Sequence, residues 1–174
     1  MGMRELKKEL EQLEKHQIVH HVLEVYKRYP RVKDYFDFFL NPDEEVLLDD
    51  YKVRVHEGFY PSRGKKLKLY RSRRAINEFK KLAVSEEAIA ELLLYFTQVA
   101  VMYGRETKVS APSFYERIEK SLRAALEFME KYELLDSFRG DVMDLVERCE
   151  PFPLHCGQHV RTIVGMFYNQ TSAV

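Results

Sequence analysis

The stretch Ser85–Tyr103, SEEAIAELLLYFTQVAVMY, decides the fold predicted for this chain. Ser85 is a good N-cap residue, because its hydroxyl can accept a hydrogen bond from an amide of the first turn. Glu86 and Glu87 place negative charge where the helix dipole favours it. Beyond this first turn, apolar residues cover most of the helix circumference, which is typical of a helix buried on several sides. The sequence therefore predicts a central helix over 85–103.

Apolar residues elsewhere recur at helical spacing and predict shorter helices around the central one. They indicate helices over 3–14 and 18–29, which could also be one continuous helix, and over 30–40, 42–58, 75–83, 112–129, 138–149 and 160–168. Asn41 and Pro42 resemble a helix start, residues 59–70 are irregular, and Gly104 with the polar run to Ser110 is expected to end the central helix. The predicted fold is all-α: a single-domain irregular helical bundle over 1–174, with seven or eight helices around the buried central helix.

Composition limits the class of protein. A chain of 174 residues can form one domain that buries roughly two thirds of its unfolded surface. Seven Gly and six Pro leave few tight turns, which favours helices over sheets. The longest apolar segment, 88–103, is shorter than a membrane span and is interrupted by Glu91. Because the N-terminal residues lack the apolar centre of a signal peptide and two cysteines make no disulfide framework, we expect a cytoplasmic protein without membrane association.

Three stretches carry a family resemblance: FFLNPDEE at 38–45, FYPSRG at 59–64 and RRAINEFKKL at 73–82. With them, the chain resembles a bacterial family of about this length that is known only as a domain of unknown function. The resemblance spans most of the chain and is clearest over 38–82, whereas residues 153–168 depart from the pattern. It implies a compact cytosolic domain, and it implies no activity, substrate or catalytic residue.

Charge is spread unevenly over a chain whose formal net charge is zero. Residues 63–81 carry nine basic residues and one acidic residue, whereas the segments on either side are net acidic. Dense cations beside an aromatic ring can neutralise phosphates and stack on a base. The same cations can instead form a solvated face, offset the acidic run at 43–50, or bind an acidic protein. The candidate binding residues are Arg63, Lys65, Lys66, Lys68, Tyr70, Arg71, Arg73 and Arg74.

A second group of candidate residues lies near the C-terminus. Two thiols and two imidazoles are ligand types of a tetrahedral zinc site, and the candidates are Cys149, His155, Cys156 and His159. Their spacing, C-x5-H-C-x2-H, matches no common zinc pattern, and Gly157 and two prolines argue against a helix through His155. Both cysteines fall on the apolar faces of their helices, where a free thiol behaves as a small hydrophobe. Core cysteines with histidines at the boundary are therefore the favoured interpretation.

Catalytic motifs are missing from the sequence, which contains no G-x-S-x-G, no phosphate-binding glycine loop and no H-E-x-x-H. We therefore favour a non-enzymatic helical binding or scaffold domain whose partner is another protein or a second copy of this chain. The alternatives are nucleic-acid or polyanion binding through 63–81, and a metal or thiol site near the C-terminus. No cofactor is expected.

Overall fold

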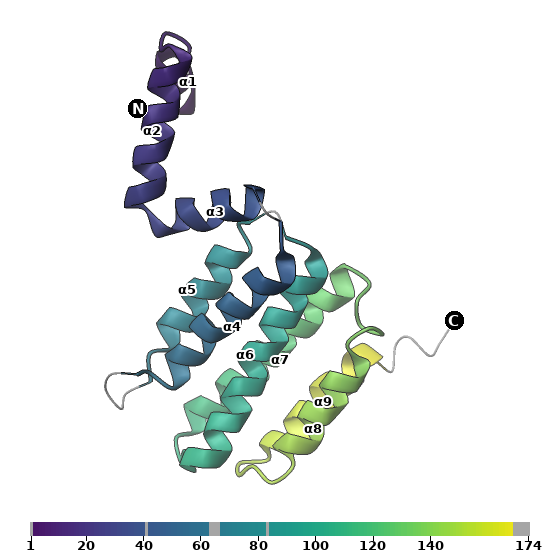
Figure 1. Ribbon diagram of the computed structural model, residues 1–174. Coiled ribbons are helices and arrows are strands. Elements are labelled where there is room, and N and C mark those ends of the chain that lie inside the picture. Colours follow the sequence, from purple (N-terminus) through teal and green to yellow (C-terminus); the bar gives the residue numbers. More distant parts are fainter. Residues whose placement is uncertain (1, 41, 63–66, 83, 169–174) are drawn as a thin grey trace. The chain divides into compact units, whose positions relative to one another are not determined.

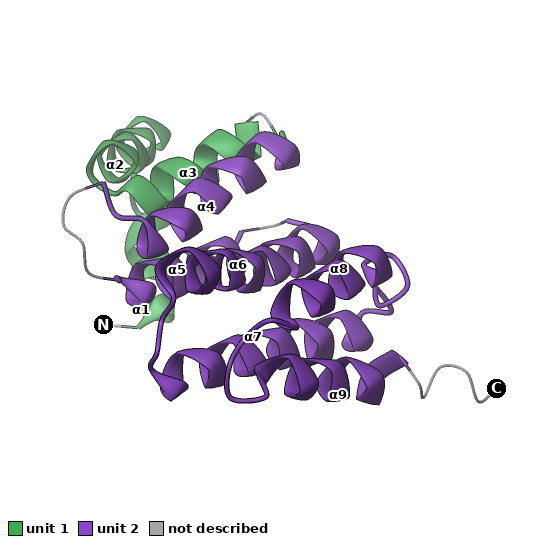
Figure 2. Cartoon of the chain, turned by 90° about the horizontal axis from the view of Figure 1, so that it is seen from below, with its two compact units in different colours: residues 1–43 green, residues 44–174 purple. Residues whose placement is uncertain are grey.

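The computed structural model describes residues 2–40, 42–62, 67–82 and 84–168. Within these ranges the chain is all-α, with nine helices and no strand, so the predicted fold class is confirmed. The chain divides into two compact units, unit 1 over residues 1–43 and unit 2 over residues 44–174 (Figure 2). That these units act as one domain stays a prediction.

Unit 1 consists of three helices: α1 (Met3–Leu10), α2 (Lys15–Arg28) and α3 (Pro30–Leu40). The break between the first two, which the sequence left open, falls at 11–14. The backbone N–H of Glu14 donates to Oε1 of Gln17 at 2.9 Å, and this cap lets α2 begin at Lys15. The Tyr26 hydroxyl donates to the Asp37 carboxylate over 2.6 Å and joins α2 to α3. Not one residue of these three helices is buried.

Unit 2 contains α4 (Glu44–Phe59), α5 (Leu69–Phe79), α6 (Glu86–Thr107), α7 (Pro112–Lys131), α8 (Arg139–Cys149) and α9 (Cys156–Tyr168). These form three successive helical hairpins (Figure 1). Because α6 packs against α4, α5, α7 and α8, the predicted central helix is confirmed. Its start is also as predicted: Oγ of Ser85 accepts from the backbone N–H of Ala88 at 3.1 Å.

The end of α6 lies beyond the predicted range 85–103 but within the polar run to Ser110. Gly104 does not end the helix, which continues to Thr107, and Lys108 then adopts a left-handed conformation with a φ of 48°. Gly104 is buried, and a Cβ built on it would lie 2.9 Å from Cε1 of Phe114. The glycine therefore serves the close approach of α7 rather than the termination of α6.

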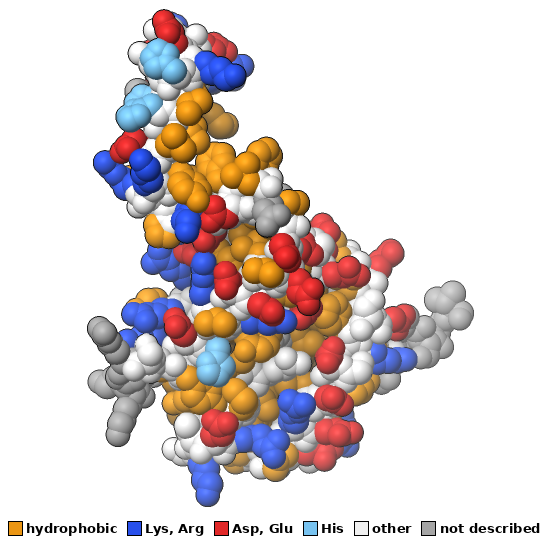
Figure 3. Space-filling view, in the orientation of Figure 1, with side chains coloured by type: hydrophobic (Ala, Val, Ile, Leu, Met, Phe, Trp, Pro, Cys, Tyr) orange, Lys and Arg blue, Asp and Glu red, His pale blue; other side chains and the backbone are white. Residues whose placement is uncertain are grey.

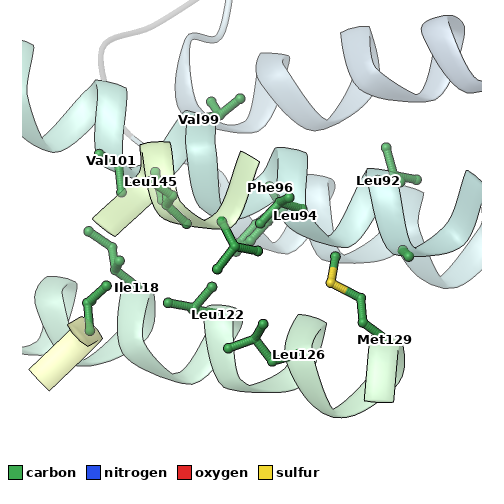
Figure 4. Close-up of a cluster of buried hydrophobic side chains, with 14 of the residues drawn as sticks. Leu92, Leu94, Phe96, Val99, Val101, Ile118, Leu122, Leu126, Met129 and Leu145 are labelled. Carbon is green, nitrogen blue, oxygen red and sulfur yellow. The ribbon is translucent and has the colours of Figure 1, made fainter. Parts of the chain in front are cut away.

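The core of unit 2 is centred on the contact between α6 and α7 (Figure 4). From α7, four side chains at spacings of three or four residues are completely buried: Ile118, Leu122, Leu126 and Met129. Leu92 and Leu94 of α6 are buried in the same cluster. Each fully buried side chain of this size contributes about 1.5–3 kcal/mol relative to leaving it exposed. The stability of unit 2 therefore comes mainly from this apolar layer.

A close contact between α4 and α5 depends on two small residues. Gly58 is buried, and a Cβ built on it would lie 1.9 Å from Oγ of Ser72. The Ser72 hydroxyl is itself held in place, because it donates to the backbone carbonyl of Val55 at 2.7 Å. The two helices can therefore pack this closely only if residue 58 has no side chain.

We predict that Gly58→Ala lowers the free energy of unfolding by about 1–3 kcal/mol, because the added methyl overpacks the contact. The matched control is Gly140→Ala in α8, where a Cβ would meet no atom within 4 Å. Alanine is the better helix former, so the control should keep or slightly raise stability. Urea unfolding followed by circular dichroism measures both. Equal stability of the two variants would contradict the close contact at Gly58.

Candidate interaction surfaces

The described part of the basic segment lies at and just before the start of α5. Arg63, Lys65 and Lys66 are outside the described residues. The five candidates that the structure does describe are Lys68, Tyr70, Arg71, Arg73 and Arg74. The last four are exposed, and Tyr70 leaves 65% of its surface accessible. The structure thus keeps these four side chains available to a partner.

The three arginines of α5 do not share one direction. At about 100° per residue they spread over about 160° of the helix circumference, on the side away from the buried residues of α5. Nε of Arg74 donates to Oε1 of Glu78 at 2.7 Å and is therefore paired with an acid. Nε of Arg71 donates to the Tyr70 hydroxyl at 3.3 Å, and this hydrogen bond lowers the pKa of Tyr70. The described arginines of α5 therefore point in different directions around the helix.

The two cysteines lie close together where α8 ends and α9 begins, and both are fully buried. Burial, with a smaller contribution from neighbouring Cys156, raises the pKa of Cys149 to about 12. Burial, with a smaller contribution from Glu119, raises the pKa of Cys156 to about 11. Both thiols are therefore protonated at neutral pH, and a protonated thiol is a poor nucleophile and a poor metal ligand.

The two histidines of the predicted zinc set are exposed. His155 lies just before α9 with a left-handed φ of 58°. Nδ1 of His159 lies 3.0 Å from Oε1 of Glu119 on α7. Over the described ranges of the chain, no three or more His, Cys, Asp or Glu side chains are grouped to hold a metal ion. The zinc hypothesis stays a prediction, and no described ligand cluster supports it.

A hollow of about 650 Å³ follows the exposed side of α6. Its lining includes Tyr95 and Met102 of α6, together with the guanidinium groups of Arg105 and Arg148. None of the lining residues is a serine, cysteine or histidine. The hollow therefore combines apolar surface with two arginines and the carboxylate of Glu106.

Unit 1 presents a surface that sequence reasoning missed. Its helices expose large apolar side chains over α2 and α3, which Figure 3 shows in orange, and also on α1. We call these residues the N-terminal apolar surface: Met3, Leu6, Val19, Val22, Leu23, Val25, Tyr29, Tyr35, Phe39 and Leu40. Phe39 and Leu40 leave 69% and 75% of their surface accessible. Exposed apolar patches on proteins occur at contact sites for proteins, membranes and ligands.

The apolar face of α2 is unusually wide. From Ile18 to Tyr29, seven apolar residues cover about 160° of the circumference, whereas a helix needs only about 100° to face a core. The sequence showed this amphipathic pattern, and we assigned the face to a core. The 43 residues of unit 1, in three helices, are too few to surround such a face by themselves.

We predict that the two cysteines make unit 2 less stable at alkaline pH. An unfolded cysteine titrates near 9.0, well below the two native values. The native state therefore keeps protons that the unfolded state releases. The contribution of the two thiols to the free energy of unfolding is fully present below pH 9. It falls as the pH rises toward 11, by about 1.4 kcal/mol per pH unit for each thiol. Urea unfolding at pH 8, 9 and 10 measures this slope.

The control for the alkaline slope is the Cys149→Ala variant. Other groups also titrate in this range, but the variant removes only the contribution of one thiol. Its stability should fall less steeply between pH 9 and pH 10 than that of the unmodified chain, whatever its stability at pH 8. Identical slopes would contradict a buried, protonated Cys149.

A comparison with known protein families identifies the family to which the chain belongs. The model described as "Family of unknown function (DUF6155)" matches residues 1–154, so the chain belongs to this family. The family resemblance drawn from 38–82 is thereby confirmed, and the match ends where the resemblance was expected to weaken. No curated protein and no solved structure matches the chain.

Proposed function

We propose that this member of a family of unknown function acts by binding another protein chain through the N-terminal apolar surface. The observation that carries the proposal is that the described residues of unit 1 form three helices, include no buried residue and expose ten large apolar side chains. Covering a Leu or Phe side chain is worth about 1.5–3 kcal/mol. A partner that covers even a few of them gains enough free energy to bind.

The charges of unit 1 favour a protein partner over a lipid surface. Residues 1–43 contain eight basic and eight acidic residues. A helix that lies on an anionic membrane carries a polar face rich in lysine and arginine, whereas the polar face of α2 has two such residues, Lys27 and Arg28, together with His16, His20, His21 and Glu24. Of the helices that the structure describes, none is long and apolar enough to cross a membrane.

Site-specific photo-crosslinking in the native cells tests this proposal. A benzoylphenylalanine in place of Val22, on the apolar face of α2, should give covalent adducts with a protein. The matched control has the same group in place of Glu24, which lies on the opposite side of the same helix. Mass spectrometry identifies each adduct. No adduct at position 22, or equal adducts at both positions, would contradict binding through this surface.

The second candidate function is binding of nucleic acid or another polyanion through 63–81. It is supported by the Tyr70 ring, which is 65% exposed and lies on α5 between Lys68 and Arg71. An exposed ring beside cations can stack on a base while the cations contact phosphates.

Fluorescence anisotropy of labelled single-stranded RNA and DNA, titrated with the protein at low and moderate salt, tests the second candidate. Binding through several cations should weaken steeply with salt, because each phosphate contact releases about one counterion. The combined variant Arg71→Glu, Arg73→Glu and Arg74→Glu should abolish it. A control with Arg117→Glu, Lys120→Glu and Arg123→Glu in α7 makes the same charge change elsewhere. Equal loss in both would show that binding is not local to α5.

A further inference from the structure

We infer that the hollow along α6 binds a small organic carboxylate with an apolar body, and that Arg105 and Arg148 hold the carboxylate. This inference concerns unit 2 alone and goes beyond the function proposed for unit 1. It draws on the size of the hollow, on two arginines without acidic partners, and on the apolar side chains beside them.

The hollow lies on a face of α6 that its neighbours leave partly open. Figure 1 shows α6 between α4 and α8, and it packs against both. Met102 lies on the open face and leaves 39% of its surface accessible. The volume of about 650 Å³ lies within the range of about 300–1,000 Å³ that is typical of small-molecule sites. The hollow is therefore of a size that suits a small molecule.

Two arginines from different helices line this hollow, Arg105 of α6 and Arg148 of α8. Among the residues that the structure describes, neither has an ion pair with an acidic side chain. Two guanidinium groups in one hollow repel each other, and an anion that binds between them removes this repulsion. The planar guanidinium group also matches the two oxygens of a carboxylate. The arginines therefore favour a carboxylate ligand.

The acidic residue in the described lining, Glu106, is held on the other side of the hollow. Its Oε2 accepts from the Tyr60 hydroxyl at 2.6 Å. Burial, with a smaller contribution from this hydrogen bond, raises the pKa of Tyr60, so the donor keeps its proton. At about 100° per residue, Arg105 and Glu106 project on opposite sides of Met102, at about 60° and 40° from it. Glu106 therefore leaves the space beside Arg105 to a ligand.

The lining also indicates what the carboxylate is attached to. Tyr95 and Met102 lie along the same face of α6 as Arg105, and the helix rises about 15 Å between residues 95 and 105. An acyl chain of medium length can lie along this distance, and a methionine adapts to such a chain because its side chain is flexible. Because Glu106 repels a second negative charge, a carboxylate fits this hollow better than a phosphate does.

A tryptophan reporter in the full chain tests the inference. The chain contains no tryptophan, so the emission of a Tyr95→Trp variant comes from the hollow alone. We expect a saturable change in emission with decanoate. The matched ligand is decan-1-ol, which has the same chain without the charge and should bind at least about tenfold more weakly. No saturable change with decanoate, or equal dissociation constants for the two ligands, would overturn the inference.

An arginine variant in the same reporter chain tests the carboxylate position. Arg105→Gln should raise the dissociation constant of decanoate about tenfold or more and leave that of decan-1-ol unchanged. The matched control is Arg123→Gln, at an exposed arginine of α7 outside the lining, which should change neither. Circular dichroism checks that helix content is retained. Unchanged decanoate binding in Arg105→Gln, or an equal loss in the control, would overturn the role of Arg105.

A substitution at the apolar part of the hollow supplies a test that keeps both arginines. Met102→Glu places a carboxylate three residues from Arg105 on the same side of the helix, where it competes with the ligand. The dissociation constant of decanoate should rise at least about tenfold, whereas Met102→Gln, which adds no charge, should largely retain binding. Equal decanoate binding by the two variants would overturn the placement of the ligand in this hollow.

Discussion

The burial of α6 on several sides is the constraint on which unit 2 depends. A helix with apolar residues around most of its circumference must be covered by neighbours, and α4, α5, α7 and α8 cover it. Its first turn is also tied to α4, because the Glu44 carboxylate accepts from both the N–H and the hydroxyl of Ser85 at 2.6 Å. Close packing around this arrangement explains the small residues at 58, 72 and 104, where a larger side chain would push helices apart.

Unit 1 follows the same amphipathic rule with a different result. Its helices have apolar faces, yet none of their residues is buried. A segment of 43 residues is too short to fold three helices around a core of their own.

The buried polar and nucleophilic groups of unit 2 belong to its packing. The Ser72 hydroxyl donates to the Val55 carbonyl, and the described part of the chain contains no buried side-chain nitrogen or oxygen without a hydrogen bond. Cys149 and Cys156 are held as neutral thiols inside the protein. Two features of the surface therefore stand out, the cations of α5 and the apolar side chains of unit 1. Both are suited to recognition of a partner.

The sequence by itself determined the helical class, the central position of 85–103, the Ser85 cap and the apolar faces of the helices that contain Cys149 and Cys156. These depend on local spacing and capping, which act within a few residues. Only the tertiary structure decided that Gly104 lies inside a helix, because the ring of Phe114 that needs the space is distant in sequence. It also decided that the other helices of unit 1 leave the face of α2 exposed. An apolar stripe predicts that a helix will bury one side, but only the arrangement of the whole chain determines what is available to bury it.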